Sequence, residues 1–383
     1  MKPPATRSVD LRRSAIREVF EAADARPGTI RLEVGEPSFP TPGHIVDGAL
    51  EAARSGHTRY TPNGGLWSLR ELLAEKVASV DGYDARPEQV VATPGAMNAL
   101  FSIYLALLEP GDEVLLPTPG FPNMDEMVSL LGGSPVFYRL HPAAGYLPDL
   151  AELESLVTPR TKAVFVNTPG NPTGAVFPPE LVEQLVGLAA EHDLYLVSDE
   201  VYDELVLDDL EHVSAGRFDT DGRVISVYSF SKIYAMTGWR LGYCVASVEL
   251  AELLRTLQEP EVSCPSTVSQ KAAEAALTGP RGPIDAMREA YRARRDLAWR
   301  LVTEAGLDAF RTQGTFYMLV DVSTAGMSSR EFTMHLLETG GVSVAPGEVF
   351  GPAGSGLVRV SLAPEPDELA EGLSRLVACL FEA

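Results

Sequence analysis

The sequence has few cysteines and no long apolar run. Its three cysteines, Cys244, Cys264 and Cys379, lie far apart and form no Cys-x-x-Cys pair, so neither a disulfide framework nor a metal site is indicated. Free thiols are typical of the reducing cytoplasm. No apolar stretch approaches the roughly 20 residues that span a bilayer, and the N-terminal segment is too polar for a signal peptide. We therefore expect a soluble protein of the cytoplasm that binds no metal.

Basic residues are also scarce. Lys and Arg total 31 against 53 Asp and Glu, which gives a formal net charge of −22 over 383 residues. Proteins that bind nucleic acids carry a basic surface, and an anionic membrane surface is equally disfavoured, so the composition argues against both partners. The hydrophobic fraction, 45%, is ordinary for a globular protein. The length suits about two to three domains.

From about residue 89, short apolar runs alternate with helical patterns. The runs that read as strands are VVAT (90–93), EVLLP (113–117), AVFVNTP (163–169), LYLVSDE (194–200), VISVYSF (224–230) and RLGYCVA (240–246). Apolar strands between helices are typical of a parallel or mixed sheet covered on both faces. Ligands of such sheets bind at the carboxyl ends of the strands, so we expect the chemistry there.

Helical patterns also cover residues 9–25, 43–55, 66–80 and 123–132. After a long charged helix at 284–304 the pattern changes. Strand-like runs follow, GTFYMLVDV (314–322), VSVAPG (342–347) and LVRVSLA (357–363), and then a final helix at 366–381. This change indicates a second, smaller α+β domain.

One lysine follows the run VISVY, in a loop of hydroxyl, aromatic and apolar residues. A desolvated lysine has a lowered pKa and can act as a Schiff-base nucleophile, which makes Lys232 a candidate. Ser229, Ser231 and Arg240 lie close in sequence and could bind a phosphate. An ordinary surface lysine is the alternative that spacing alone leaves open.

Other polar residues also follow predicted strands. Asn171 lies in the rigid loop NTPGNPTG, and Asp199 and Tyr202 lie in SDEVY. There a carboxylate could hold a protonated ring nitrogen and a phenol could donate to an oxyanion. The alternative for NTPGNPTG is a tight turn without chemistry, and the alternative for SDEVY is that Asp199 caps the next helix. The strand-to-helix turn at 93–98 offers backbone N–H groups to an anion.

A single arginine, Arg359, lies within the apolar run LVRVSLA. A charge in such a strand is unfavourable unless it is paired. Either a structural salt bridge or a substrate carboxylate would provide the partner. Taken together, these candidates match a cofactor with a phosphate, a ring nitrogen, a phenolic oxygen and an aldehyde, and pyridoxal phosphate has all four.

The same motifs resemble those of the class I/II aminotransferases, pyridoxal-phosphate enzymes of fold type I, close to their aspartate/aromatic branch. The resemblance runs from about residue 14 to the C-terminus. Its most specific motifs are SFSKIYAMTGWRLGY, NTPGNPTG and SDEVYDEL, and it is strengthened by GEPSFPTP, RYTPNGGLWSLRELLAEK and LVRVSLA.

The resemblance implies roles around the cofactor ring. Lys232 resembles the lysine that forms the Schiff base and then moves the substrate proton, and Asp199 the carboxylate that keeps the ring nitrogen protonated. Tyr202 and Asn171 resemble the pair that bonds the phenolic oxygen. Phe121 matches the aromatic residue that stacks on the ring, where Trp or Tyr is commoner.

The resemblance also implies the anion contacts. The residues matched to the cofactor phosphate are Ala96, Met97, Ser229, Ser231 and Arg240, the first two through their backbone amides. Tyr60 resembles the residue that reaches the phosphate bound by the partner subunit. Arg359 resembles the arginine that holds the substrate α-carboxylate, assisted by Gly35.

Met97 stands where relatives often have a polar residue. Arg17 is expected as an exposed helical residue, with contact to an acidic side chain as its alternative. No other basic residue stands out for a second substrate carboxylate.

The implied fold is α/β, with a mostly parallel seven-stranded sheet covered by helices on both faces and a smaller α+β domain. The expected large cofactor-binding domain spans residues 43–282, and residues 1–42 and 283–383 form the small one. The expected protein is a homodimer with shared active sites that transfers amino groups by a ping-pong mechanism. The same cofactor residues also serve lyases and cyclases, and a cofactor-sensing regulator is a third, less compatible alternative for so acidic a chain.

Overall fold

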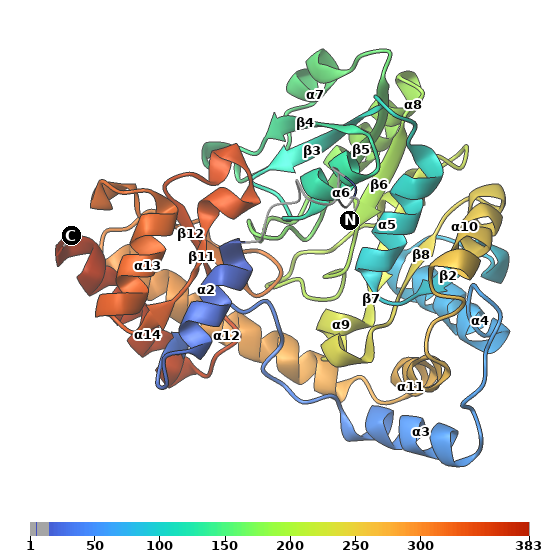
Figure 1. Cartoon of the computed structure of the whole chain (residues 1–383), viewed down its shortest axis with the longest axis horizontal. Coiled ribbons are helices and arrows are strands. Elements are labelled where there is room, and N and C mark those ends of the chain that lie inside the picture. The colour runs from blue at the N-terminus through green and yellow to red at the C-terminus, as the bar shows by residue number, and fades with distance from the viewer. Residues whose placement is uncertain (1–4, 6–14, 383) are drawn as a thin grey trace.

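A seven-stranded sheet forms the centre of the larger part of the molecule (Figure 1). This computed structural model describes residue 5 and residues 15–382. The strands, from one edge of the sheet to the other, are β2 (Val90–Thr93), β8 (Gly242–Val245), β7 (Val224–Ser229), β6 (Tyr195–Asp199), β5 (Thr161–Asn167), β3 (Glu113–Thr118) and β4 (Ser134–Arg139). β8 alone runs opposite to the other six strands. The expected mostly parallel sheet is thus confirmed.

One strand of this sheet, β4, is not among the runs that the sequence pattern predicted. Its residues SPVFYR are mostly half-exposed or exposed, because β4 is an edge strand and pairs only with β3. It therefore lacks the continuous apolar character by which the buried strands are recognised.

Helices cover both faces of the sheet. The helices of this larger part are α3 (Gly43–Arg54), α4 (Trp67–Lys76), α5 (Ala96–Leu107), α6 (Met124–Leu130), α7 (Leu150–Leu156), α8 (Pro179–Glu191), α9 (Phe230–Ile233), α10 (Val248–Glu261) and α11 (Thr267–Thr278). Side chains alternate between the faces of a strand. Phe165 and Val197 therefore pack with α5, α6 and α10 on one face, and Val164 and Leu196 pack with α7 and α8 on the other.

The smaller part combines the two ends of the described chain. Its helices and strands are α2 (Ala15–Asp24), β1 (Ile30–Arg31), α12 (Gly282–Glu304), β9 (Tyr317–Asp321), α13 (Ser329–Thr339), β10 (Val342–Ser343), β11 (Ala345–Pro346), β12 (Leu357–Ser361) and α14 (Pro366–Glu382). Strand β1 pairs with β10, and β12 lies between β11 and β9. Figure 1 shows α2 beside β11 and α13, although these elements lie at opposite ends of the chain.

Several predicted boundaries shift. The run VSVAPG is not one strand, because β10 pairs with β1 whereas β11 pairs with β12 in another sheet. The helix predicted over 66–80 ends at Lys76 and continues as a wider helical turn, Val77–Asp81. The helix predicted over 9–25 is confirmed as α2 from Ala15, and its earlier part lies outside the described residues. Within residues 15–382, none of the helices has the length and apolar character needed to cross a membrane.

The order of the strands gathers the ends of distant segments at one edge. β5, β6 and β7 are parallel neighbours, so their last residues Asn167, Asp199 and Ser229 lie side by side. β2 has the same direction, since both it and β7 are antiparallel to β8. The start of α5 and the loop before β8 therefore reach this edge too.

A buried ion cluster ties α4 to the loop after β6. Nζ of Lys76 lies 3.2 Å from Oδ2 of Asp81 and makes a shorter contact with Oδ2 of Asp203. All three side chains are less than a tenth exposed. Removal of the lysine would leave two buried carboxylates without their cation, the situation in which a buried ion pair matters most.

We therefore predict that Lys76→Met lowers the free energy of unfolding by about 3–5 kcal/mol, measured by urea denaturation. Lys271→Met is the matched control, because its ion pair with Glu274 on α11 is partly exposed, and it should lower stability by about 1 kcal/mol or less. Equal losses in the two variants would contradict a special role for the buried cluster.

Candidate active site

A cavity of about 550 Å³ opens at the carboxyl edge of the large sheet. Its walls come from that edge, from β9 and β12, and from the segment that contains α2 and Gly35. Of the predicted site residues, those that line it are Gly35, Ala96, Met97, Phe121, Asn171, Asp199, Tyr202, Ser229, Ser231, Lys232, Arg240 and Arg359. Residues more than 300 positions apart in the sequence thus face one space.

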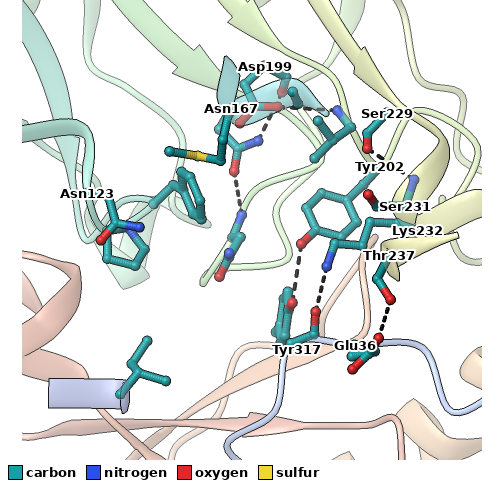
Figure 2. Close-up of a pocket in the computed structure, with 18 of the residues that line it drawn as sticks. Glu36, Asn123, Asn167, Asp199, Tyr202, Ser229, Ser231, Lys232, Thr237 and Tyr317 are labelled. Atoms are coloured by element: carbon teal, nitrogen blue, oxygen red, sulfur yellow. Dashed lines mark hydrogen bonds between the residues drawn. The ribbon is translucent and has the colours of Figure 1, made fainter. Parts of the chain in front are cut away.

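Lys232 lies on the short helix α9, directly after β7. Ser229, the last residue of β7, caps this helix by accepting a hydrogen bond from the amide of Ser231 at 3.0 Å. Nζ of Lys232 donates to the carbonyl oxygen of Gly35 at 2.5 Å (Figure 2). The lysine therefore points into the cavity and is held by an uncharged acceptor from the N-terminal segment.

Asp199 lies deep in the cavity, only 4% exposed. Burial raises the pKa of its carboxyl group to about 7, and the negative charge of Glu200 adds to the rise. A hydrogen bond from the amide of Val201 and the positive charge of Lys232 lower this pKa in part. No ion pair among residues 15–382 includes Asp199, so a cation that entered the cavity would stabilise its charged form.

The loop 167–174 positions its asparagines through backbone contacts. Nδ2 of Asn167 donates to the carbonyl oxygen of Asp199 at 2.9 Å, and its Oδ1 accepts from the amide of Asn171 at 2.6 Å. The Thr168–Pro169 and Asn171–Pro172 peptide bonds are cis. This loop is not a simple turn, because it presents the side chain of Asn171 to the cavity.

The start of α5 provides a place for an anion. Its first residues follow Gly95, which has φ 83° and, as glycine, no side chain to cap the helix. A Cβ at Gly95 would lie 2.5 Å from Nη2 of Arg240, and one at Gly242 would lie 2.7 Å from the amide of Ala96. The guanidinium and the helix N-terminus are thus packed together, an arrangement suited to a phosphate.

Arg359 projects from β12 into the cavity and is 3% exposed. Its Nη1 donates to Oδ1 of Asn171 and its Nη2 to the carbonyl oxygen of Glu33, both at 2.9 Å. Its Nε is buried and has no hydrogen-bond partner among the described residues, and burial lowers the pKa of the guanidinium. No ion pair within the described part of the chain includes this arginine, so the structural salt bridge considered from the sequence is absent there. A carboxylate from outside the chain would meet this need.

Figure 2 shows further side chains that the sequence reasoning did not single out. Tyr317, at the start of β9, accepts a hydrogen bond from the Tyr202 hydroxyl at 3.2 Å. The side chain of Thr237 donates to that of Glu36. Asn167 lies within the recognised motif NTPGNPTG and could have been found from it. Tyr317 could not, since nothing in the apolar run GTFYMLVDV distinguishes it from a core residue.

Tyr60 is the predicted site residue that lies elsewhere. Its side chain is 90% exposed and, with Arg59 and Cys264, lines a separate hollow on the surface. A single chain therefore does not bring this tyrosine to the cavity.

The residues in the cavity fit pyridoxal phosphate. The uncapped helix start with Arg240 suits its phosphate, the buried carboxylate of Asp199 suits its protonated ring nitrogen, and Lys232 suits its aldehyde. The unpartnered Nε of Arg359 remains available to a substrate carboxylate.

Comparisons with known proteins agree with this interpretation. Residues 27–376 match the family described as aminotransferase class I and II. The aspartate/prephenate aminotransferase of Thermus thermophilus is 39% identical over 386 residues, which cover 100% of this chain and 97% of that protein. The aromatic-amino-acid aminotransferase 2 of Thermococcus litoralis is 39% identical and covers 96% of both chains.

The fold is similar to solved structures as well. A single mutant of the Thermus thermophilus aspartate aminotransferase superposes with a TM-score of 0.95 at 39% identity, covering 99% of this chain and 100% of that one. The aromatic aminotransferase of Pyrococcus horikoshii gives a TM-score of 0.90 at 38% identity, with coverage of 95% and 99%.

The raised pKa of Asp199 gives a test in the cofactor-free protein. An acid whose folded pKa exceeds its ordinary value holds a proton that the unfolded chain releases, so stability falls as the pH rises from about 4 to about 7. Asp199→Asn carries no charge and removes this fall. We predict that the variant gains on the order of 3 kcal/mol over the wild type between pH 5 and pH 8.

Urea denaturation at the two pH values, at one protein concentration, measures this gain. Asp193→Asn is the control, because the Asp193 side chain is fully exposed, and this variant should gain far less than Asp199→Asn between the two pH values. A gain in Asp199→Asn that is equal at both pH values would show that burial does not perturb this carboxyl group.

Proposed function

Because the chain belongs to the class I and II aminotransferases, pyridoxal-phosphate enzymes that move an amino group between an amino acid and a 2-oxo acid, we propose that the cavity lined by Lys232, Asp199 and Arg359 is its active site. The observation that carries this proposal is the convergence of these side chains with the uncapped start of α5 in one space. The named activities of the relatives favour transfer over elimination, cyclisation or a regulatory role.

Lys232 is the central catalytic residue of the proposal. Pyridoxal phosphate, when bound, supplies an aldehyde for Schiff-base chemistry and a conjugated ring that accepts electrons. Nζ of Lys232 would hold the aldehyde and would be released when an amino acid enters. The free amine would then take the proton from Cα of the amino acid. The 2-oxo acid product leaves before the acceptor binds, which gives ping-pong kinetics.

Three residues would hold the ring in its reactive state. The carboxylate of Asp199 would keep the ring nitrogen protonated, and this contact would also lower the raised pKa of the carboxyl group itself. Tyr202 and Asn171 would donate to the phenolic oxygen. Asn171 accepts from Arg359 through its Oδ1, which leaves its Nδ2 to donate. The Tyr202 hydroxyl donates to Tyr317 and would turn this proton to the phenolic oxygen when the cofactor binds. Phe121 lines the same cavity and would stack on the ring.

Two anion contacts would set the position of cofactor and substrate. The residues proposed for the phosphate are Ala96, Met97, Ser229, Ser231 and Arg240. Arg359 would bind the α-carboxylate of the amino acid, and the backbone of Gly35 would close over it. The support for Arg359 is its burial without an acidic partner in the part of the chain that the structure describes.

We further propose a homodimer with shared sites. Tyr60 would reach the cofactor phosphate of the partner subunit, which is consistent with its 90% exposure on a single chain.

The proposed division is a large domain of residues 43–282 and a small domain of residues 1–42 and 283–383, supported by the pairing of β1 with β10. We propose the cytoplasm as its location, and no nucleic acid, membrane or metal as a partner.

The first test replaces the lysine. Lys232→Ala should lose the visible absorption change that accompanies cofactor loading and at least a thousandfold of the amino transfer rate, because both the covalent anchor and the proton acceptor are removed. Lys271→Ala, on α11 and paired with Glu274, should keep both. Products decide the reaction type: a 2-oxo acid with pyridoxamine phosphate is expected, and release of ammonia or of a ring product would contradict transfer.

The second test concerns the shared site. The protein should sediment as a dimer, and Tyr60→Phe should bind pyridoxal phosphate several-fold more weakly without change in the dimer, since one hydrogen bond of about 1 kcal/mol is lost. Tyr83→Phe serves as the control, because its hydroxyl bonds to Tyr228 in the interior. An unchanged cofactor affinity in Tyr60→Phe, or a monomer with full activity, would refute the shared site.

A further inference from the structure

Tyr317 lines the cavity but has no role of its own in the proposed function. It is the first residue of β9 and is 1% exposed, as a core residue would be. Its side chain nevertheless contacts two residues to which the proposed function gives separate tasks, Tyr202 and Arg359. These contacts are different in kind, because one is made by the hydroxyl group and the other by the ring.

The pairing of β9 with β12 brings the ring of Tyr317 to Arg359. In this antiparallel pair Arg359 lies opposite Leu319, and Ser361 lies opposite Tyr317. Residues two apart in a strand point to the same face of a sheet, so Tyr317 and Arg359 are diagonal neighbours on one face. The guanidinium carbon of Arg359 lies 4.1 Å from the centre of the Tyr317 ring.

A second ring also lies near this guanidinium. The centre of the Phe350 ring is 5.0 Å from the guanidinium carbon of Arg359, and Phe350 is 2% exposed. The face of an aromatic ring attracts a cation, and the attraction is stronger where water is excluded. The two rings therefore hold the guanidinium without giving it a negative counter-ion, which leaves its charge to a ligand.

The hydroxyl group of Tyr317 contacts Tyr202. It accepts the hydrogen bond of the Tyr202 hydroxyl at 3.2 Å (Figure 2), and the two rings meet edge to face with their centres 6.0 Å apart. A Cβ at Gly35 would lie 2.7 Å from the Tyr317 oxygen, so the N-terminal segment limits where this hydroxyl can move. The proton of the Tyr317 hydroxyl has no acceptor among the described residues.

Cofactor binding would reverse the direction of this hydrogen bond. When Tyr202 turns its proton to the phenolic oxygen, the oxygen of Tyr202 becomes free to accept. The unused proton of Tyr317 can then be donated to it. Because hydrogen bonds in a chain polarise one another, Tyr202 would become a stronger donor to the phenolic oxygen.

We propose that Tyr317 is a positioning residue for both parts of the site: its ring holds Arg359 for the substrate α-carboxylate, and its hydroxyl supports Tyr202 at the phenolic oxygen of the cofactor. This inference rests on the proposed function and deepens it. Tyr317 acts through these two residues and takes no proton from the substrate. Since its ring and its hydroxyl have different partners, two substitutions separate their effects.

Tyr317→Phe tests the hydroxyl in the protein loaded with pyridoxal phosphate. A donor to the phenolic oxygen stabilises the negative charge that remains when the nitrogen joining Lys232 to the cofactor loses its proton. A weaker donor should leave this proton bound up to a higher pH. We expect the pH at which the visible absorption of the bound cofactor changes to rise by about half a unit. The charged groups near Tyr202, which are Asp199, Lys232 and Arg359, stay the same in this variant.

Tyr138→Phe is the matched control for this titration. It also loses a buried hydroxyl hydrogen bond, to the carbonyl oxygen of Phe165 at 2.9 Å, but it does not line the cavity, so it should titrate as the wild type does. An unchanged titration in Tyr317→Phe would overturn the role of the hydroxyl. A change to lower pH would overturn it as well, because it would mean that Tyr317 only competes for the proton of Tyr202.

Tyr317→Leu and Phe350→Leu test the rings. Calorimetry with butyrate, a monocarboxylate without an amino group, measures how well Arg359 binds a carboxylate in the pyridoxal phosphate form. Loss of either ring should weaken butyrate binding about fivefold. Tyr317→Phe keeps its ring and should bind butyrate within twofold of the wild type, whereas Phe350→Leu keeps the Tyr317 hydroxyl and should show the wild-type titration. Butyrate binding that is unchanged in both leucine variants would overturn the role of the rings.

The outcomes separate this inference from the proposed function. If the wild type shows no change in visible absorption with pyridoxal phosphate and transfers no amino groups, the proposed function fails. If it does both, but the Tyr317 variants titrate and bind butyrate as the wild type does, only the inference about Tyr317 is overturned.

Discussion

The site depends on two ionisable side chains, Asp199 and Arg359, that are buried in one cavity. Neither has a counter-ion among the described residues. Asp199 is 4% exposed and Arg359 is 3% exposed, and neither takes part in an ion pair there. The pKa of Asp199 is raised and that of Arg359 is lowered, in both cases chiefly by burial. Each is an unfavourable state that a ligand of opposite charge relieves. The surrounding residues hold the two charges in place: Asn167 bonds to the backbone of Asp199, and Asn171 bonds to Arg359.

This arrangement depends on the order of the strands. Parallel pairing of β5, β6 and β7 brings their carboxyl ends together. Because β8 is antiparallel to β7, it begins at the same edge, and the loop before it holds Arg240 against the start of α5. The second sheet supplies Arg359 from β12 and Tyr317 from β9. The site is therefore a contact between two sheets, and neither sheet contains all of it.

The N-terminal segment completes the cavity from a third direction. Gly35 accepts a hydrogen bond from Lys232, and Glu36 from Thr237. At Gly35 a Cβ would lie 2.7 Å from the Tyr317 hydroxyl, so a larger residue there would displace this hydroxyl. The same segment contains α2, from which Ile16, Arg17 and Phe20 line the cavity.

Local patterns in the chain were sufficient for most of the buried strands, for several of the helices and for the loops that carry Lys232, Asp199, Asn171 and Arg240, because period, turn chemistry and strand ends are properties of neighbouring residues. The edge strand β4 had no such signal, since its side chains are mostly half-exposed or exposed. The break between β10 and β11 had none either, because it reflects pairing with two different sheets.

The resemblance to a family added roles to residues already at strand ends, but it did not separate the two interpretations of Arg17 or distinguish Tyr317 from the core. The sequence by itself determined the fold class, the cofactor chemistry and most residues of the site. Only the tertiary structure decided that Arg359 lacks an acidic partner among the described residues, that Tyr202 bonds to Tyr317, and that Arg17 and Asn123 line one cavity. The physical reason is that these relations join segments more than 100 residues apart, and packing, not local pattern, sets which side chains meet.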